Sequence, residues 1–335
     1  MLAIPDESCH RTKIADWLEL KAIESPDGRV GFGTLIAAAA LTENEQEENI
    51  ADEDAEEDRL VEDVQEEIAR RRESIGDDYP FRIDENGQAL RLIKPFTKAG
   101  SIYLFCLFLS HAFDRTIVPK KLAPRVTNGE RDLFQACSTV AAGGYVQGPA
   151  ISFGWPRPDG STYLRALKRV YSLFGDGTPH KRARPAASQA VKDNGVDIIA
   201  WRRAPDELPG TLYMVAQVAS GVDWVDKSVV TYRRHFHDYW FERKPGSPTT
   251  DAMFMPFGLE PDLPGDGTPY KEVLVDHLQG IGYKFGLLFY RDRIARHFGD
   301  GMRLIEAGET QIERHENLPK IVKWVNNYSK RLQSA

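Results

Sequence analysis

The sequence predicts an α/β fold for the second part of the chain, preceded by a mostly helical first part. Two apolar runs, residues 196–201 and 211–218, have the length and composition of buried strands, and a loop containing prolines joins them. Apolar residues recur at helical spacing before this pair, within 129–144, and we expect another helix after it, at 223–241. An order in which helices and strands alternate is typical of the α/β class.

Residues 1–125 predict a separate, mostly helical accessory domain for recognition or assembly. Helical spacing is seen near residues 14–23 and 60–68, and 99–113 has the composition of a buried helix. The turn signal Asn86-Gly87 predicts a short hairpin within 81–92. We expect the second domain to span residues 126–335, with a further strand at 283–289 and a helix that opens near Asp292.

The charge of the chain is unevenly distributed. Residues 43–67 contain 14 acidic side chains and one basic side chain, so this segment carries −13. Because the whole chain carries −7, the other 310 residues carry +6. An acidic run of this kind is typical of a solvated helix face or a connector. The alternative is that it mimics phosphate and covers a basic groove until a partner displaces it.

Composition predicts a water-soluble cytoplasmic protein. The hydrophobic content is 41%, the charged content is 28%, and no apolar run approaches the length that spans a bilayer. The N-terminus shows no secretion signal. The three cysteines are odd in number and widely spaced, which fits neither a disulfide framework nor a paired zinc site and indicates a reducing compartment.

Two polar residues within the predicted strand pair suggest a metal site. Asp197 lies in an apolar strand, where a carboxylate is costly to bury unless it meets a cation or hydrogen-bond donors. Gln217 stands near the end of the next strand, and a hairpin can bring both side chains to one edge of the sheet. With the carbonyl of Val218, these oxygens would suit Mg²⁺. The alternative is an Asp that caps a turn and a Gln at a sheet edge.

These residues resemble the PD-(D/E)XK, or restriction-endonuclease-like, nucleases. That superfamily places an Asp on one strand and Glu/Gln-x-Lys on the next, and a preceding helix often supplies a Glu. Asp197 and Gln217 match the two strand positions. Glu130 is the best upstream candidate, with Asp132 as its competitor and a simple first-turn acid as the alternative. The resemblance covers about residues 129–240, and the strings Gly-Val-Asp-Ile-Ile-Ala and Ala-Gln-Val-Ala-Ser-Gly look most like prokaryotic restriction and phage-defence branches.

The resemblance implies a restriction-endonuclease-like mixed sheet flanked by helices and a metal-dependent nuclease, acting on DNA in anti-phage defence. Mg²⁺, or Mn²⁺, would be held by Glu130, Asp197 and Gln217. The chain departs from the pattern at Ala219, where the family has lysine. Lys192 and Lys227 are the two available substitutes. If neither serves, the chain is a catalytically degenerate module that binds nucleic acid or scaffolds a defence complex.

Basic residues around the predicted strands are candidates for holding a nucleic-acid backbone. Such contacts position a substrate without reading its sequence. The partners expected are therefore DNA, other proteins of a defence system and a second copy of the chain, and no membrane. The loop Gly154-Trp155-Pro156-Arg157 is either a rigid turn that packs its Trp or a site where an exposed Trp stacks on a base. The basic candidates are Lys181, Arg182, Arg184, Arg202, Arg203, Arg233 and Arg234.

Overall fold

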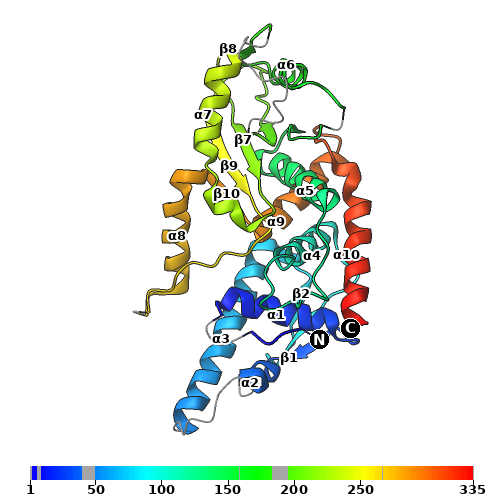
Figure 1. Ribbon diagram of the computed structural model, residues 1–335, viewed down its shortest axis with the longest axis vertical. Coiled ribbons are helices and arrows are strands. Elements are labelled where there is room, and N and C mark those ends of the chain that lie inside the picture. Colours follow the sequence, from blue (N-terminus) through cyan, green and yellow to red (C-terminus); the bar gives the residue numbers. More distant parts are fainter. Residues whose placement is uncertain are drawn as a thin grey trace.

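The computed structural model describes residues 2–5, 9–39, 50–157, 159–182, 195–265 and 267–334. The molecule is elongated, with the largest sheet in one half and α1, α2 and much of α3 in the other (Figure 1). Its helices are α1 (Arg11–Glu24), α2 (Gly33–Ala39), α3 (Ile50–Ile75), α4 (Lys98–Ser110), α5 (Asn128–Val146), α6 (Tyr163–Phe174), α7 (Val229–Trp240), α8 (Tyr270–Phe285), α9 (Arg291–Glu306) and α10 (Leu318–Gln333). Short 3₁₀ helices are η1 (Gly76–Asp78), η2 (Val222–Asp226) and η3 (His315–Asn317). The strands are β1 (Arg29–Gly31), β2 (Phe81–Ile83), β3 (Ala89–Leu92), β4 (Ala150–Ser152), β5 (Thr178–Pro179), β6 (Ile198–Trp201), β7 (Tyr213–Val218), β8 (Phe241–Arg243), β9 (Thr249–Phe254) and β10 (Leu287–Phe289).

A five-stranded mixed sheet, in the order β10-β9-β7-β6-β4, forms the centre of the second part. Strand β6 pairs antiparallel with both β4 and β7, whereas β7, β9 and β10 run parallel to one another. In the β6–β7 hairpin Ile198 faces Ala216 and Trp201 faces Tyr213. The prediction of an α/β fold with this strand pair is therefore confirmed.

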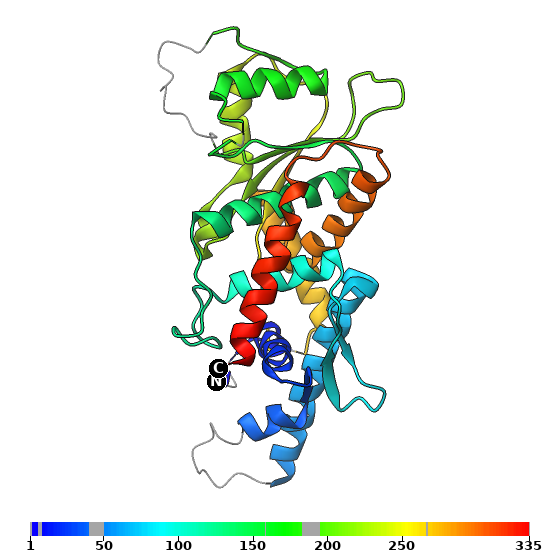
Figure 2. The ribbon, with the colours of Figure 1, turned by 90° about the vertical axis from the view of Figure 1, so that its right-hand side faces the viewer.

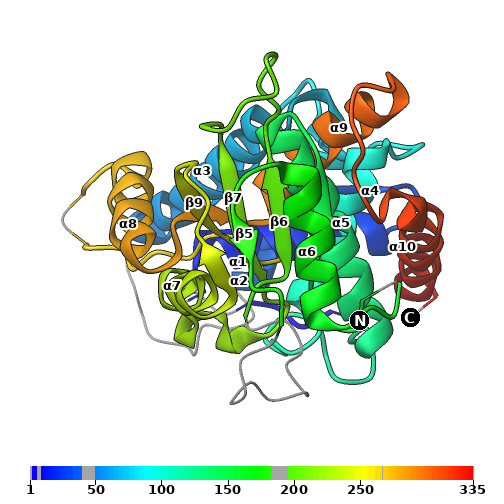
Figure 3. The same ribbon diagram turned by 90° about the horizontal axis from the view of Figure 1, so that it is seen from above.

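Helices cover both faces of the sheet, which gives three layers. Alternate strand residues such as Ile198 and Met214 pack in one hydrophobic cluster with α5 and α9. Their neighbours Ile199 and Val215 pack with α6 and α7 in a second cluster, and Met253 packs with α7 and α8 in a third. Figure 2 shows α6 and α5 on opposite sides of the strands. Figure 3, which looks along the long axis, shows α8 and α10 at opposite sides of the molecule.

The first part of the chain is mostly helical and contains the predicted hairpin. Strands β2 and β3 pair antiparallel, and β1 adds a third strand beside β3. Helix α4 is buried along nearly its whole length, and its Cys106 lies in the same cluster as Cys137 of α5. This cluster extends from Leu2 to Leu332, so residues of both predicted domains share one core.

Two expectations need correction. The strand predicted at 283–289 is only Leu287–Phe289, because the helical spacing of Leu278, Ile281 and Phe285 continues α8 through Phe285 and leaves Tyr283 89% exposed. In the acidic segment, residues 43–49 lie outside the described residues and the rest belongs to α3. Glu56, Asp58, Glu62 and Glu66 are exposed, as expected of a solvated helix face, whereas the last residue of the segment, Glu67, is fully buried. None of the helices in the described ranges is long and apolar enough to cross a membrane.

Candidate metal and nucleic-acid site

Asp197 lies at the meeting point of three chain segments, immediately before β6. Its backbone N–H donates to the Ala216 carbonyl of β7 at 2.8 Å. Its carbonyl accepts from the N–H groups of Phe153 and Gly154, at 2.7 and 3.0 Å, in the loop that follows β4. The carboxylate accepts a hydrogen bond from the Val218 N–H through Oδ2, at 2.8 Å. These bonds fix the half-buried carboxylate at the edge where β6 begins and β7 ends.

Gln217 is buried at the same edge, with 4% of its surface exposed. Its Oε1 finds no hydrogen-bond donor in the described part of the chain. Its Nε2 packs against Gly195, since a Cβ on that residue would lie 2.9 Å from Nε2 and 2.6 Å from the Tyr232 ring. A buried amide oxygen without a donor costs free energy, and a bound cation would remove that cost.

Helix α5 contributes Gln135 to this edge. Gln135 donates to Ser152 Oγ at 2.9 Å and lies against Gly154, where a Cβ would clash with the Gln135 amide and lie 2.8 Å from Asp197 Oδ1. Sequence reasoning missed Gln135. The signal in the sequence was a polar side chain between two apolar residues, Phe134 and Ala136, both of which are buried in the structure.

Glu130 occupies a different position. Its carboxylate accepts from the Thr127 N–H at 2.7 Å and from the Thr127 hydroxyl at 2.5 Å, which completes a capping box at the start of α5. Partial burial would raise the pKa of Glu130, but the hydrogen bonds from the Thr127 side chain and from the backbone together lower it. Glu130 precedes Gln135 by five residues, or about 7.5 Å along the helix axis. Its competitor Asp132 pairs with Arg314.

The structure describes only one of the two predicted lysines. Lys192 lies outside the described residues. Lys227 is half-buried between η2 and α7 and forms no ion pair with any residue that the structure describes. Ala219, which occupies the family's lysine position, is buried in the cluster formed with α7 and α8.

The basic candidates differ in their availability. Five of them are exposed: Lys181, Arg182, Arg202, Arg203 and Arg234. Arg184 lies outside the described residues. Arg233 binds Asp251 through two hydrogen bonds, of 2.9 and 3.0 Å, which raise the pKa of its guanidinium. Sequence reasoning missed three exposed basic residues on α6. Their spacing of i, i+3 and i+4 predicts that they lie on one face of the helix. They are Arg165, Lys168 and Arg169.

The edge fits a divalent cation in part. Asp197 supplies a carboxylate and Gln217 an unsatisfied amide oxygen, and both are ligand types that Mg²⁺ takes. Within the described residues no three His, Cys, Asp or Glu side chains gather as a metal cluster. The ligands that this edge offers are Asp197 and Gln217, while the Glu130 carboxylate is engaged with Thr127 at the start of α5.

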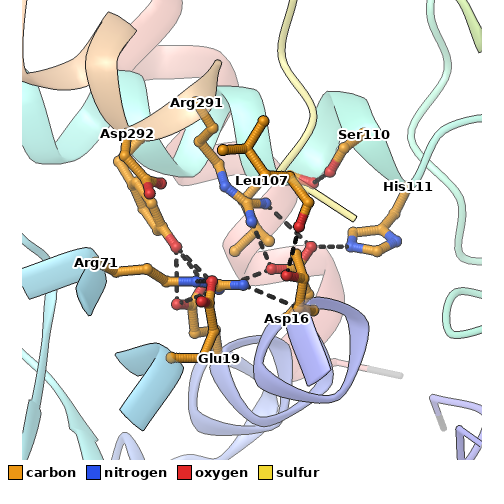
Figure 4. Close-up of polar contacts among 12 residues, drawn as sticks. Asp16, Glu19, Arg71, Leu107, Ser110, His111, Arg291 and Asp292 are labelled. Carbon is orange, nitrogen blue, oxygen red and sulfur yellow. Dashed lines mark hydrogen bonds and ion pairs between the residues drawn. The ribbon is translucent and has the colours of Figure 1, made fainter. Parts of the chain in front are cut away.

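A second polar constellation, buried among α1, α3, α4 and α9, is shown in Figure 4. Asp16 binds Arg291 at 2.5 and 3.1 Å, and His111 Nε2 lies 2.9 Å from its carboxylate. Arg71 binds Glu19 at 2.7 Å and Glu67 at 2.8 Å. Burial would raise the pKa of Asp16, but Arg291 and Arg71 hold it well below its usual range. Because each of these arginines is paired with carboxylates from distant segments, we assign the network to structure.

Asp16 and His111 also line a cleft of about 460 Å³. Residues of η2 and α8 also line it, among them the apolar Trp224 and Phe285 and the basic Lys284. Its volume is within the range of small-molecule pockets, about 300–1,000 Å³. The sheet-edge residues Asp197 and Gln217 do not line this cleft.

Comparison with known proteins gives no match: no family model fits the sequence, and no curated protein and no solved structure is similar to the chain. Function is therefore inferred from the residues and the geometry of this chain.

Proposed function

We propose that this chain is a metal-dependent nuclease of the restriction-endonuclease-like type that hydrolyses phosphodiester bonds of DNA in prokaryotic defence. The observation that carries the proposal is the position of Asp197 and Gln217 at one edge of adjacent antiparallel strands. Gln217 leaves a buried oxygen there that no described donor satisfies. The mixed sheet between two helical layers supports the family resemblance.

In this proposal Asp197 and Gln217 hold one divalent cation. Bound Mg²⁺ supplies charge that polarises the scissile phosphate and lowers the pKa of a coordinated water. The hydrogen bond from Val218 orients the Asp197 carboxylate before substrate arrives, and such preorganisation avoids a reorganisation cost during the reaction. Lys227, which forms no ion pair within the described ranges, is the lysine that we assign to stabilising negative charge on the phosphate.

The exposed basic residues around the sheet would hold the DNA backbone. Lys181 and Arg182 follow β5, while Arg202 and Arg203 follow β6. Each phosphate contact releases counterions, so binding should weaken steeply with salt. Arg233 contributes indirectly, because its pair with Asp251 fastens α7 to β9.

A second function is favoured by two observations. Ala219 is buried where the family has lysine, and Glu130 is engaged in a capping box. Both fit a degenerate module that binds nucleic acid or scaffolds a complex without cutting. This alternative keeps the fold and the basic surface but assigns no chemistry to Asp197.

The test is cleavage of plasmid and single-stranded DNA with Mg²⁺ or Mn²⁺. Wild type is compared with Asp197→Ala and with Asp206→Ala, an exposed carboxylate in the loop of the same hairpin. The proposal expects cleavage by wild type and Asp206→Ala but not by Asp197→Ala. DNA binding without cleavage by wild type, alone or with its partner proteins, would favour the degenerate module.

A further inference from the structure

The loop between β4 and α6 lies directly against Asp197. The N–H groups of Phe153 and Gly154 both donate to the Asp197 carbonyl. A Cβ on Gly154 would lie 2.8 Å from Asp197 Oδ1, so the bare backbone of the loop touches the carboxylate. The next residue is Trp155, whose Cα is about 3.8 Å from that of Gly154.

Trp155 is 48% exposed, although its aromatic neighbours Phe153 and Tyr163 are buried. Beneath it, Arg157 is only 6% exposed, and its guanidinium lies 5.2–5.4 Å from the ring centroids of Phe153, Trp155 and Tyr163. Arg157 also donates to the Ser161 carbonyl at 3.2 Å. The indole therefore lies over a buried cation that also contacts the Phe153 and Tyr163 rings, yet about half of its own surface faces solvent.

Exposed basic residues lie on the helix that follows this loop. Helix α6 begins at Tyr163, whose ring contacts Arg157, and its exposed Arg165, Lys168 and Arg169 follow within two turns. Arg169 pairs with Glu313, whereas Arg165 forms no ion pair with any described residue. An exposed aromatic ring beside basic side chains is the combination that binds unpaired nucleic-acid strands, because every base has a π-face and every linkage a phosphate.

We infer that Trp155 stacks on an unpaired nucleobase beside the scissile phosphate, which makes the substrate single-stranded, frayed or locally opened DNA. This inference rests on the proposed function, since it places the base next to Asp197. Within an undistorted duplex each base is covered on both faces by its neighbours, so an indole can stack only at an end, on a base that has left the helix, or at a step that has been opened. Trp155 is then a positioning residue that sets strandedness, and Asp197 remains the catalytic residue.

The experiment measures binding of a 20-nucleotide single strand and of the matching blunt duplex by fluorescence anisotropy. Trp155→Ala should weaken single-strand binding about 5- to 150-fold, the equivalent of one base–aromatic stack. Trp155→Phe should recover part of the loss. Leu208→Ala, which truncates a more exposed apolar side chain in the 202–210 loop, is the matched control and should bind like wild type. Duplex affinity should change about twofold or less in all variants.

A strand of the same length without bases separates stacking from general damage to the loop. Wild type should prefer the natural strand to the abasic strand, and Trp155→Ala should lose most of that preference. Equal losses on single strand and duplex, or an unchanged preference in Trp155→Ala, would overturn the inference while leaving the nuclease proposal intact. If wild type bound neither DNA, both the inference and the proposed function would fail.

Discussion

Replacing Gly195 by alanine tests whether the candidate site is as tightly packed as the structure indicates. Gly195 has φ +75°, a left-handed conformation in which a Cβ costs about 1–2 kcal/mol. The new Cβ would also lie 2.6 Å from the Tyr232 ring and 2.9 Å from Gln217 Nε2. Crowding of this kind typically costs a further 1–3 kcal/mol or so. Because alanine also restricts the unfolded chain by about 0.4–1 kcal/mol, we expect a net loss of about 2–4 kcal/mol in the free energy of unfolding.

Gly160→Ala is the matched control. Gly160 has φ +61°, but no described atom lies within 4 Å of the place that its Cβ would take. Only the backbone cost therefore applies, and the net loss in the free energy of unfolding should be about 1 kcal/mol. Both variants would be unfolded with urea and followed by circular dichroism. Gly195→Ala should also bind Mn²⁺ more weakly, because the Gln217 amide must move. Equal stability losses in the two variants, with unchanged Mn²⁺ affinity, would refute the packing described for this edge.

Two further predictions concern buried charges. Arg291→Met should lower the free energy of unfolding by about 3–5 kcal/mol, because it leaves Asp16 buried without its main partner. Arg303→Met, which breaks an exposed pair, should cost about 1 kcal/mol or less. Equal losses of the two variants in urea unfolding would contradict the assignment of the network to structure. Burial lowers the pKa of His237 from 6.5 to about 4. Between these values the unfolded chain takes up a proton and the folded chain does not, so stability should fall from pH 6.5 toward pH 4 by up to about 3 kcal/mol. This loss of stability should be smaller in His237→Gln but unchanged in His235→Gln, whose histidine is exposed. If stability fell with pH to the same extent in wild type and both variants, the loss would not come from His237.

The elements that the sequence predicts well are those with a local signal. The β6–β7 hairpin follows from two apolar runs, and the 81–92 hairpin from Asn86-Gly87. The capping box is also local, since Thr127 and Glu130 are three residues apart. That spacing explains why Glu130, which the family pattern proposes as a metal ligand, caps the helix on which it lies.

The remaining features depend on partners that are distant in sequence. Asp16 meets Arg291 across 275 residues, and no periodicity reveals such a pair. Gln135 reaches the sheet edge only because α5 rests on β4 and β6 at one particular rotation. The exposure of Trp155 depends on how Arg157 packs beneath it. The loop sequence alone is compatible with either a packed or an exposed ring.

The most direct test of the central claim is Mn²⁺ binding followed by electron paramagnetic resonance. Wild type, Asp197→Asn and Asp206→Asn would be titrated under the same conditions, with circular dichroism to verify folding. We expect one Mn²⁺ site in wild type and in Asp206→Asn. Asp197→Asn keeps the shape of the side chain but removes its charge. It should therefore lower the Mn²⁺ affinity at least about tenfold, the equivalent of about 1.4 kcal/mol. Equal Mn²⁺ affinity in wild type and Asp197→Asn would contradict the assignment of a metal to this edge.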